Sequence, residues 1–214
     1  MCEDAGREFW RILHRNIKQR VGDQMNKERL GAFMDAVIAI VMTILVLELK
    51  KPAGPSLEDF FKLRINFAAY ALSFLWLAAM WTSLHNAWHV ADKISKRTMW
   101  LSMGLLFFSS LFPYATSLVS TWFSSRVVQG FYGMIVIATT VMMIFIYKSL
   151  AKDDEREETV KYMSTVNRFL MIDVGIKAAG AVIGVLFWPP LVSIAVFVAA
   201  VFIMIVRATN SIEI

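Results

Sequence analysis

The feature that most constrains this chain is an apolar run, residues 29–49, that is about as long as a lipid bilayer is thick. Its 20 residues from Leu30 to Leu49 would span ~30 Å as a helix rising ~1.5 Å per residue. One carboxylate, Asp35, lies within the first two turns. A charge at that depth costs about 2.5–3.5 kcal/mol on insertion scales, so Asp35 indicates an interior contact or a permeation path.

Five more apolar runs follow, and together they predict an all-α, polytopic membrane protein with six transmembrane helices. The predicted spans are 30–49, 64–90, 99–123, 127–148, 167–187 and 190–206. The composition agrees, because 57% of the 214 residues are hydrophobic, 18% are charged and the mean hydropathy is +0.56. A soluble domain of this size would expose too much apolar surface. Pro113 is expected to kink the third span, because proline has no backbone donor.

The positions of the basic residues predict the orientation. The net charge of +5 comes from Lys and Arg beside the spans, which is typical of membrane topology and does not indicate nucleic-acid binding. With the N-terminus inside, 16 of the 22 basic residues are cytoplasmic, five are outside and Lys177 is within the membrane. Both termini are therefore expected in the cytoplasm. The single cysteine, Cys2, excludes an internal disulfide framework and any cysteine metal cluster.

Two regions are expected along the chain. Residues 1–28 predict a cytoplasmic amphipathic segment that lies on an anionic leaflet or packs beneath neighbouring subunits, and 29–214 form the transmembrane domain. Ser56, three residues before Asp59, predicts the start of a helix. The segment 152–161 is expected to be a solvated, charged connection with no chemistry of its own.

A helical wheel places Asp35 away from an aliphatic stripe on the first span. Asp35 lies about 140° from Ile40 on this wheel. If the carboxylate points into its own bundle, the stripe of Ile40, Ile44 and Leu47 points outward. Thr43 lies beside that stripe. The sequence leaves open whether the stripe meets lipid or another subunit.

The second span ends with two histidines at i, i+4 spacing. His85 and His89 lie on one helix face, one turn after Trp81, and such a pair can bind a metal. No third ligand has matching placement, so we interpret the pair as a hydrogen-bonding set and expect no metal site. His85 is a candidate partner for the buried Asp35, and Arg29 at the membrane boundary can supply the opposite charge.

The fifth span carries Asp173 and Lys177, also at i, i+4 spacing, which predicts an intramembrane ion pair. Such a pair suits a proton-coupled transporter, although simple charge neutralisation explains it too. Gly180 and Gly184 give a weak signal for close helix packing. The chain has no nucleophile elbow, phosphate loop or zinc-protease motif, so no catalytic residue and no enzyme activity are expected. The TVGYG filter of many potassium channels is also absent.

The first span resembles the R-x-x-x-F-S-D signature of the first helix in the transmembrane protein 175 family of potassium channels. Arg29, Phe33 and Asp35 match it, whereas Met34 stands where the family has serine. Two further stretches extend the resemblance over most of 29–123. They are the Trp81…His85 segment, which resembles the family's W-x-x-x-H pattern, and LLFFSSLFPY at 105–114, which resembles its third helix.

The resemblance implies a passive, potassium-favouring channel without cofactors. It implies a homotetramer in the prokaryotic plasma membrane, whose partners are its own copies, the bilayer and permeant K+ ions. The first helix would line a central pore and constrict it with rings of aliphatic side chains. The implied pore-lining and gate residues are Ile40, Thr43, Ile44 and Leu47. The implied structural network that holds the pore helix is Arg29, Phe33, Asp35, Trp81 and His85.

Two other functions stay open at this point. One is a proton-coupled secondary transporter or proton-conducting protein that uses Asp35, Asp173 and Lys177, although no inverted repeat is evident. The other is a membrane scaffold in which the first-span stripe faces lipid.

Overall fold

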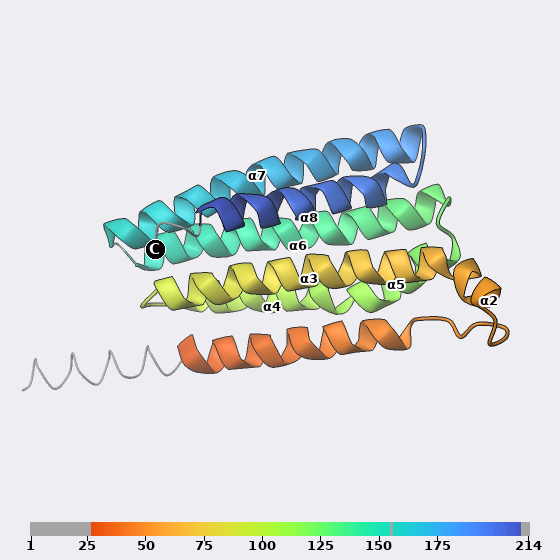
Figure 1. Cartoon of the computed structure of the whole chain (residues 1–214). Helices are drawn as coiled ribbons and strands as arrows, with labels where there is room; N and C mark the ends of the chain where they lie inside the picture. Colours follow the sequence, from red (N-terminus) through yellow and green to blue (C-terminus); the bar gives the residue numbers. More distant parts are fainter. Residues whose placement is uncertain (1–26, 155, 211–214) are drawn as a thin grey trace, which may run out of the picture.

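The computed structural model describes residues 27–154 and 156–210, and their regular structure is entirely helical (Figure 1). Within these residues, five helices are long and apolar enough to cross a membrane. They are Lys27–Leu47 (the first helix), α3 Arg64–Val90, the α4–α5 pair over Lys96–Thr121, α6 Arg126–Asp153 and α7 Glu157–Leu186. The last helix, α8 (Leu191–Asn210), is apolar over the shorter range Leu191–Ile205. The prediction of a polytopic helical membrane protein is confirmed.

The predicted amphipathic segment 1–28 lies outside the described residues, except for its last two. Lys27 and Glu28 belong to the first helix.

The third predicted span is broken into two helices beside Pro113. Helix α4 covers Lys96–Ser110 and α5 covers Phe112–Thr121, with Leu111 between them. The Leu111 N–H turns back to the Phe108 carbonyl at 3.2 Å. Pro113 then occupies the first turn of α5, where a missing N–H leaves no helix carbonyl without a donor. The kink predicted from the proline is confirmed.

A short helix, α2 (Leu57–Lys62), precedes α3 and begins at the predicted residue. The Ser56 hydroxyl accepts a hydrogen bond from the Asp59 N–H at 3.2 Å and also lies 2.6 Å from the Asp59 carboxylate. This contact satisfies one of the free backbone donors at the helix start, as the spacing of Ser56 and Asp59 predicted.

The long helices lie side by side with their axes roughly parallel, an arrangement that suits a bilayer (Figure 1). The first helix lies along one side of the bundle and α7 along the opposite side, with α3 and α6 between them. Buried hydroxyls link the inner helices. Tyr132 of α6 lies 3.1 Å from Ser73 of α3, and Thr116 of α5 donates to the same Ser73 at 2.7 Å. Such contacts satisfy polar side chains where no water is available.

Helices α7 and α8 approach closely at two glycines. A Cβ built on Gly180 would lie 2.1 Å from the Cβ of Ala195, and one on Gly184 would lie 2.7 Å from a methyl group of Val192. Neither position has room for a side chain. The small residues therefore set the distance between these helices, as the glycine spacing indicated.

One buried carboxylate, Asp154, joins the turns at the α3–α4 and α6–α7 connections. Asp154 is 5% exposed, accepts a hydrogen bond from the Asp92 N–H at 2.9 Å and forms a 2.6 Å ion pair with Arg156. Arg156 also donates to the Val90 carbonyl at 2.7 Å. These bonds, led by the Arg156 guanidinium, hold the pKa of Asp154 well below its usual range. The expectation that 152–161 is merely solvated is therefore wrong for Asp154.

Candidate functional site

The first helix has two faces of different exposure. One face packs against the rest of the bundle through a buried apolar stripe: Leu30, Met34, Ile38, Val41 and Leu45. The repeat of three and four residues is that of a helix packed along one side. The other face, although strongly apolar, is not covered by any of the residues that the structure describes (Figure 1).

The residues proposed from sequence for a pore lie on that uncovered face. Ile40 is 57% exposed, Ile44 is 37% exposed and Leu47 is 78% exposed. Thr43 is also exposed, and its hydroxyl donates to the Ile40 carbonyl at 2.8 Å. Because its proton is used inside the helix, the Thr43 hydroxyl presents only oxygen lone pairs to whatever lies opposite.

Asp35 connects the first helix to α3. Its carboxylate accepts a hydrogen bond from the indole N–H of Trp81 at 2.8 Å. The partner is therefore Trp81 and not His85, which lies one turn further along α3. Among the described residues, no ion pair joins Arg29 to Asp35, and both Arg29 and Phe33 are exposed. Of the predicted structural network, the structure brings together Asp35, Trp81 and His85.

Three aromatic rings form a ladder on the α3 face beside Asp35. The His85 ring stacks on Trp81 with 5.1 Å between centroids and 30° between planes. His85 Nε2 lies 3.0 Å from His89 Nε2, one turn further on. The ladder thus extends from the Asp35 carboxylate to the end of α3.

The base of the first helix is tied to the turn after α3. The Lys27 ammonium donates to the Ala91 carbonyl at 2.8 Å. The next residue in that turn, Asp92, is held by Asp154 and Arg156. Two contacts between polar groups, at Asp35 and at Lys27, therefore fix the N-terminal half of the first helix against α3 and the turn that follows it.

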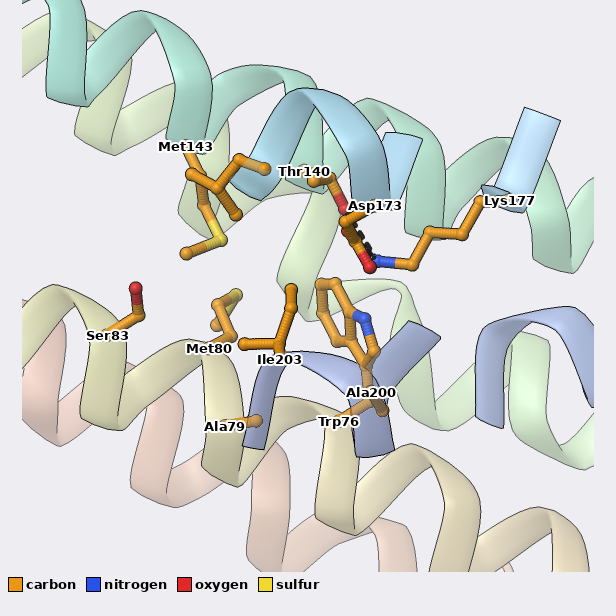
Figure 2. Close-up of a pocket in the computed structure, with 11 residues that line it drawn as sticks. Trp76, Ala79, Met80, Ser83, Thr140, Met143, Asp173, Lys177, Ala200 and Ile203 are labelled. Carbon is orange, nitrogen blue, oxygen red and sulfur yellow. Dashed lines mark hydrogen bonds and ion pairs between the residues drawn. The ribbon is translucent and has the colours of Figure 1, made fainter. Parts of the chain in front are cut away.

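Asp173 and Lys177 lie on the opposite side of the bundle, in α7, and form a buried ion pair (Figure 2). The Lys177 ammonium also donates to the Thr140 hydroxyl at 3.1 Å and lies 5.1 Å from the centre of the Trp76 ring. A small cavity of about 20 Å³ beside the pair is lined by Ser83 among others, and that volume is enough for a single water molecule. Because α3 and α6 lie between α7 and the first helix, this pair does not reach the uncovered face (Figure 1).

Comparisons with known proteins match the part of the chain that contains the first helix and α3. The family described as endosomal/lysosomal potassium channel TMEM175 matches residues 29–113, the region that holds the first helix, α3 and α4. A potassium channel of Chryseobacterium sp. (strain P1-3) is 33% identical over 140 residues, which are 64% of this chain and 73% of that relative. The chain belongs to the TMEM175 family of potassium channels. This is a family of ion channels and not of enzymes.

Two other relatives show a similar fold and a different named activity, respectively. The crystal structure of a potassium-selective TMEM175 homologue from Chamaesiphon minutus covers 85% of this chain and 98% of its own, with a TM-score of 0.68 at 23% identity, and therefore supports the fold. The mouse relative is 28% identical over 51% of this chain, but this match spans only 22% of the mouse protein. That mouse relative is named a proton channel.

Two features of the site were not predicted from the sequence. One is the contact of Lys27 with the Ala91 carbonyl, which no spacing indicates. The other is the buried Asp154, whose only signal is that it lies between two apolar runs, in a connection too short to stay far from the bundle.

Proposed function

We propose that four copies of this chain assemble around a central, potassium-favouring pore lined by their first helices. In this assembly, Ile40, Ile44 and Leu47 form stacked rings that narrow the pore, and Thr43 adds a ring of hydroxyls. The observation that carries this proposal is the uncovered apolar face of a helix whose opposite face is packed into its own subunit.

The exposed face of the first helix suits gating by exclusion of water from the pore. A ring of aliphatic side chains excludes water when narrow, and it conducts when it widens enough to become wet. Leu47, 78% exposed and near the end of the helix, would form the ring at the end opposite Lys27. One subunit offers no polar passage of its own along this face, so a pore needs several copies.

The Thr43 hydroxyl supplies a reason for cation preference. Its proton is bound by the Ile40 carbonyl at 2.8 Å, so the oxygen lone pairs are left for a passing cation. Potassium loses hydration water more cheaply than sodium does, and a narrow, weakly polar ring favours potassium for that reason. We expect a modest preference compared with filters built from backbone carbonyls.

Asp35 and Trp81 belong to the structural network that holds the pore helix in this proposal. Their 2.8 Å hydrogen bond fixes the rotation of the first helix, so that Ile40 points away from α3. Both termini lie in the cytoplasm of a prokaryotic cell, as the basic residues predict.

The test uses the chain reconstituted in planar bilayers. Ile40→Asn is expected to increase the conductance or the open probability, because an amide in the ring lowers the cost of wetting. The matched control is Val182→Asn. Val182 is 60% exposed, close to the 57% of Ile40, but it belongs to α7, the helix on the opposite side of the bundle from the first helix (Figure 1). Equal currents in both variants and in the unchanged chain would exclude a pore at Ile40.

Reversal potentials under opposed gradients test the ion. A reversal potential that follows the potassium gradient supports the proposal. Equal permeability to sodium and potassium would remove its potassium part. A reversal potential that follows the pH gradient alone would favour the proton-conducting alternative, and loss of that current in Asp173→Asn/Lys177→Gln would place it at the buried pair.

A further inference from the structure

The two histidines at the end of α3 bring two ring nitrogens together on one face of the helix. His85 and His89 are the two members of an i, i+4 pair whose Nε2 atoms face each other at 3.0 Å. We propose that they form a binding site for a divalent transition-metal ion of the Cu²⁺ or Ni²⁺ class. This site is separate from the pore, and the proposal does not depend on the pore.

The type and number of ligands favour the Cu²⁺ and Ni²⁺ class. Imidazole is a suitable ligand for both ions, and Cu²⁺ has the highest affinity among the divalent first-row metals. Two imidazoles on one helix face, with water in the remaining positions, suit a square-planar or tetragonal site, whereas structural Zn²⁺ sites take four protein ligands. In the metal-free form the two Nε2 atoms are hydrogen-bonded at 3.0 Å, so the exposed His89 ring must turn to aim both lone pairs at one ion.

The surroundings hold one ligand in place and leave the other adjustable. His85 is half-buried and stacks on Trp81, and Trp81 is in turn held by its hydrogen bond to Asp35. His89 is exposed and can rotate to meet a metal ion from outside the bundle. A ligand fixed by its neighbours binds with less loss of freedom than one that must be ordered.

Proton balance is simple at this pair. In the metal-free form, one Nε2 carries the proton that the other accepts. When the metal binds, that proton moves to Nδ1 of the same ring, so two neutral imidazoles present two Nε2 lone pairs without net proton release. Within the described residues, no third His, Cys, Asp or Glu completes a three-ligand group, so water fills the remaining positions.

The test is Cu²⁺ titration of the purified full chain, with any affinity tag removed and in a Cys2→Ser background, because a thiol binds and reduces Cu²⁺. Electron paramagnetic resonance is expected to show one Cu²⁺ per chain with nitrogen couplings from two imidazoles. His89→Asn is expected to weaken binding roughly tenfold or more and to leave the coupling of one imidazole, because the second contact is then lost.

Two controls use the histidine count of the chain. His14→Asn removes the third histidine and is expected to change nothing. Asn86→His combined with His89→Asn keeps three histidines but moves one from i+4 to i+1, where side chains do not face each other, so it is expected not to restore binding. Equal Cu²⁺ affinity in the unchanged chain and in His89→Asn, or a one-imidazole spectrum in both, would overturn the proposal.

Discussion

The close approach of α7 to α8 gives a sharp prediction for Gly180→Ala. The new Cβ would lie 2.1 Å from the Cβ of Ala195, whereas ordinary contacts of this kind begin near 3.4 Å, so the two helices must separate by about 1.3 Å there. Overpacking of this kind costs about 1–3 kcal/mol. Alanine gains about 1 kcal/mol over glycine in helix propensity, which offsets part of the cost. We expect a net loss of up to about 2 kcal/mol in the free energy of unfolding, and a stability about 1–3 kcal/mol below that of an alanine introduced without a clash.

The assay is unfolding in detergent, followed by tryptophan fluorescence and by the loss of the monodisperse peak in size-exclusion chromatography. The matched control is Gly175→Ala on the same helix, where an added Cβ meets nothing within 4 Å. That variant is expected to be neutral or slightly stabilised, because it gains helix propensity without a clash. If Gly180→Ala were as stable as Gly175→Ala, the packing of α7 on α8 described above would be wrong.

Three other substitutions test the polar contacts. Trp81→Phe keeps an aromatic ring but removes the indole N–H that binds Asp35, so it is expected to cost about 1.5–3 kcal/mol in unfolding experiments. The control Trp100→Phe makes the same change at a residue 70% exposed and is expected to cost under about 0.5 kcal/mol. Lys177→Met leaves the Asp173 charge buried and is expected to cost about 3–5 kcal/mol, most of which the double variant Asp173→Leu/Lys177→Met recovers; an intolerant double variant would contradict this. Asp154→Asn is expected to cost about 2 kcal/mol at pH 7. Because the folded pKa of Asp154 is lowered, its contribution is complete above the unfolded value of about 3.9 and fades as the pH falls below it, so unfolding curves of the variant and the unchanged chain are expected to converge in acid, and a constant difference would refute this.

The helices of this fold could be predicted from the sequence because their signals are local. An apolar run of bilayer length predicts a span wherever it occurs, and Pro113 predicts a break because its missing N–H is a property of one residue. The start of α2 at Ser56 depends on contacts three residues apart. Such features need no knowledge of which helices are neighbours.

The partners across helices could not be predicted because they depend on register. Asp35 bonds Trp81 rather than His85, a difference of one helical turn, or about 5.4 Å of sliding between the first helix and α3. That register is set by how the packed stripe fits against its neighbours and by Lys27 at Ala91. The stripe leaves a helical repeat in the sequence, but the repeat does not say which residues lie opposite it, and the Lys27 contact leaves no pattern at all. The burial of Asp154 could not be predicted for the same reason, because it depends on how the turn after α3 packs against the turn after α6.

The exposed face of the first helix was predicted more successfully. The wheel placed Ile40, Ile44 and Leu47 away from Asp35, and all three are exposed in the single chain. Their role as rings of a pore stays a prediction, because it concerns contacts between chains.

Disulfide cross-linking at Leu47 tests that role most directly. In a Cys2→Ser background, Leu47→Cys is expected to form covalent dimers between subunits on oxidation in membranes and to bring the current under control of water-soluble thiol reagents. Leu45→Cys, on the buried stripe, is expected to do neither. If the cysteine at residue 47 instead reacted only with lipid-soluble reagents and never joined two subunits, the first helix would face lipid and the proposed pore would not exist.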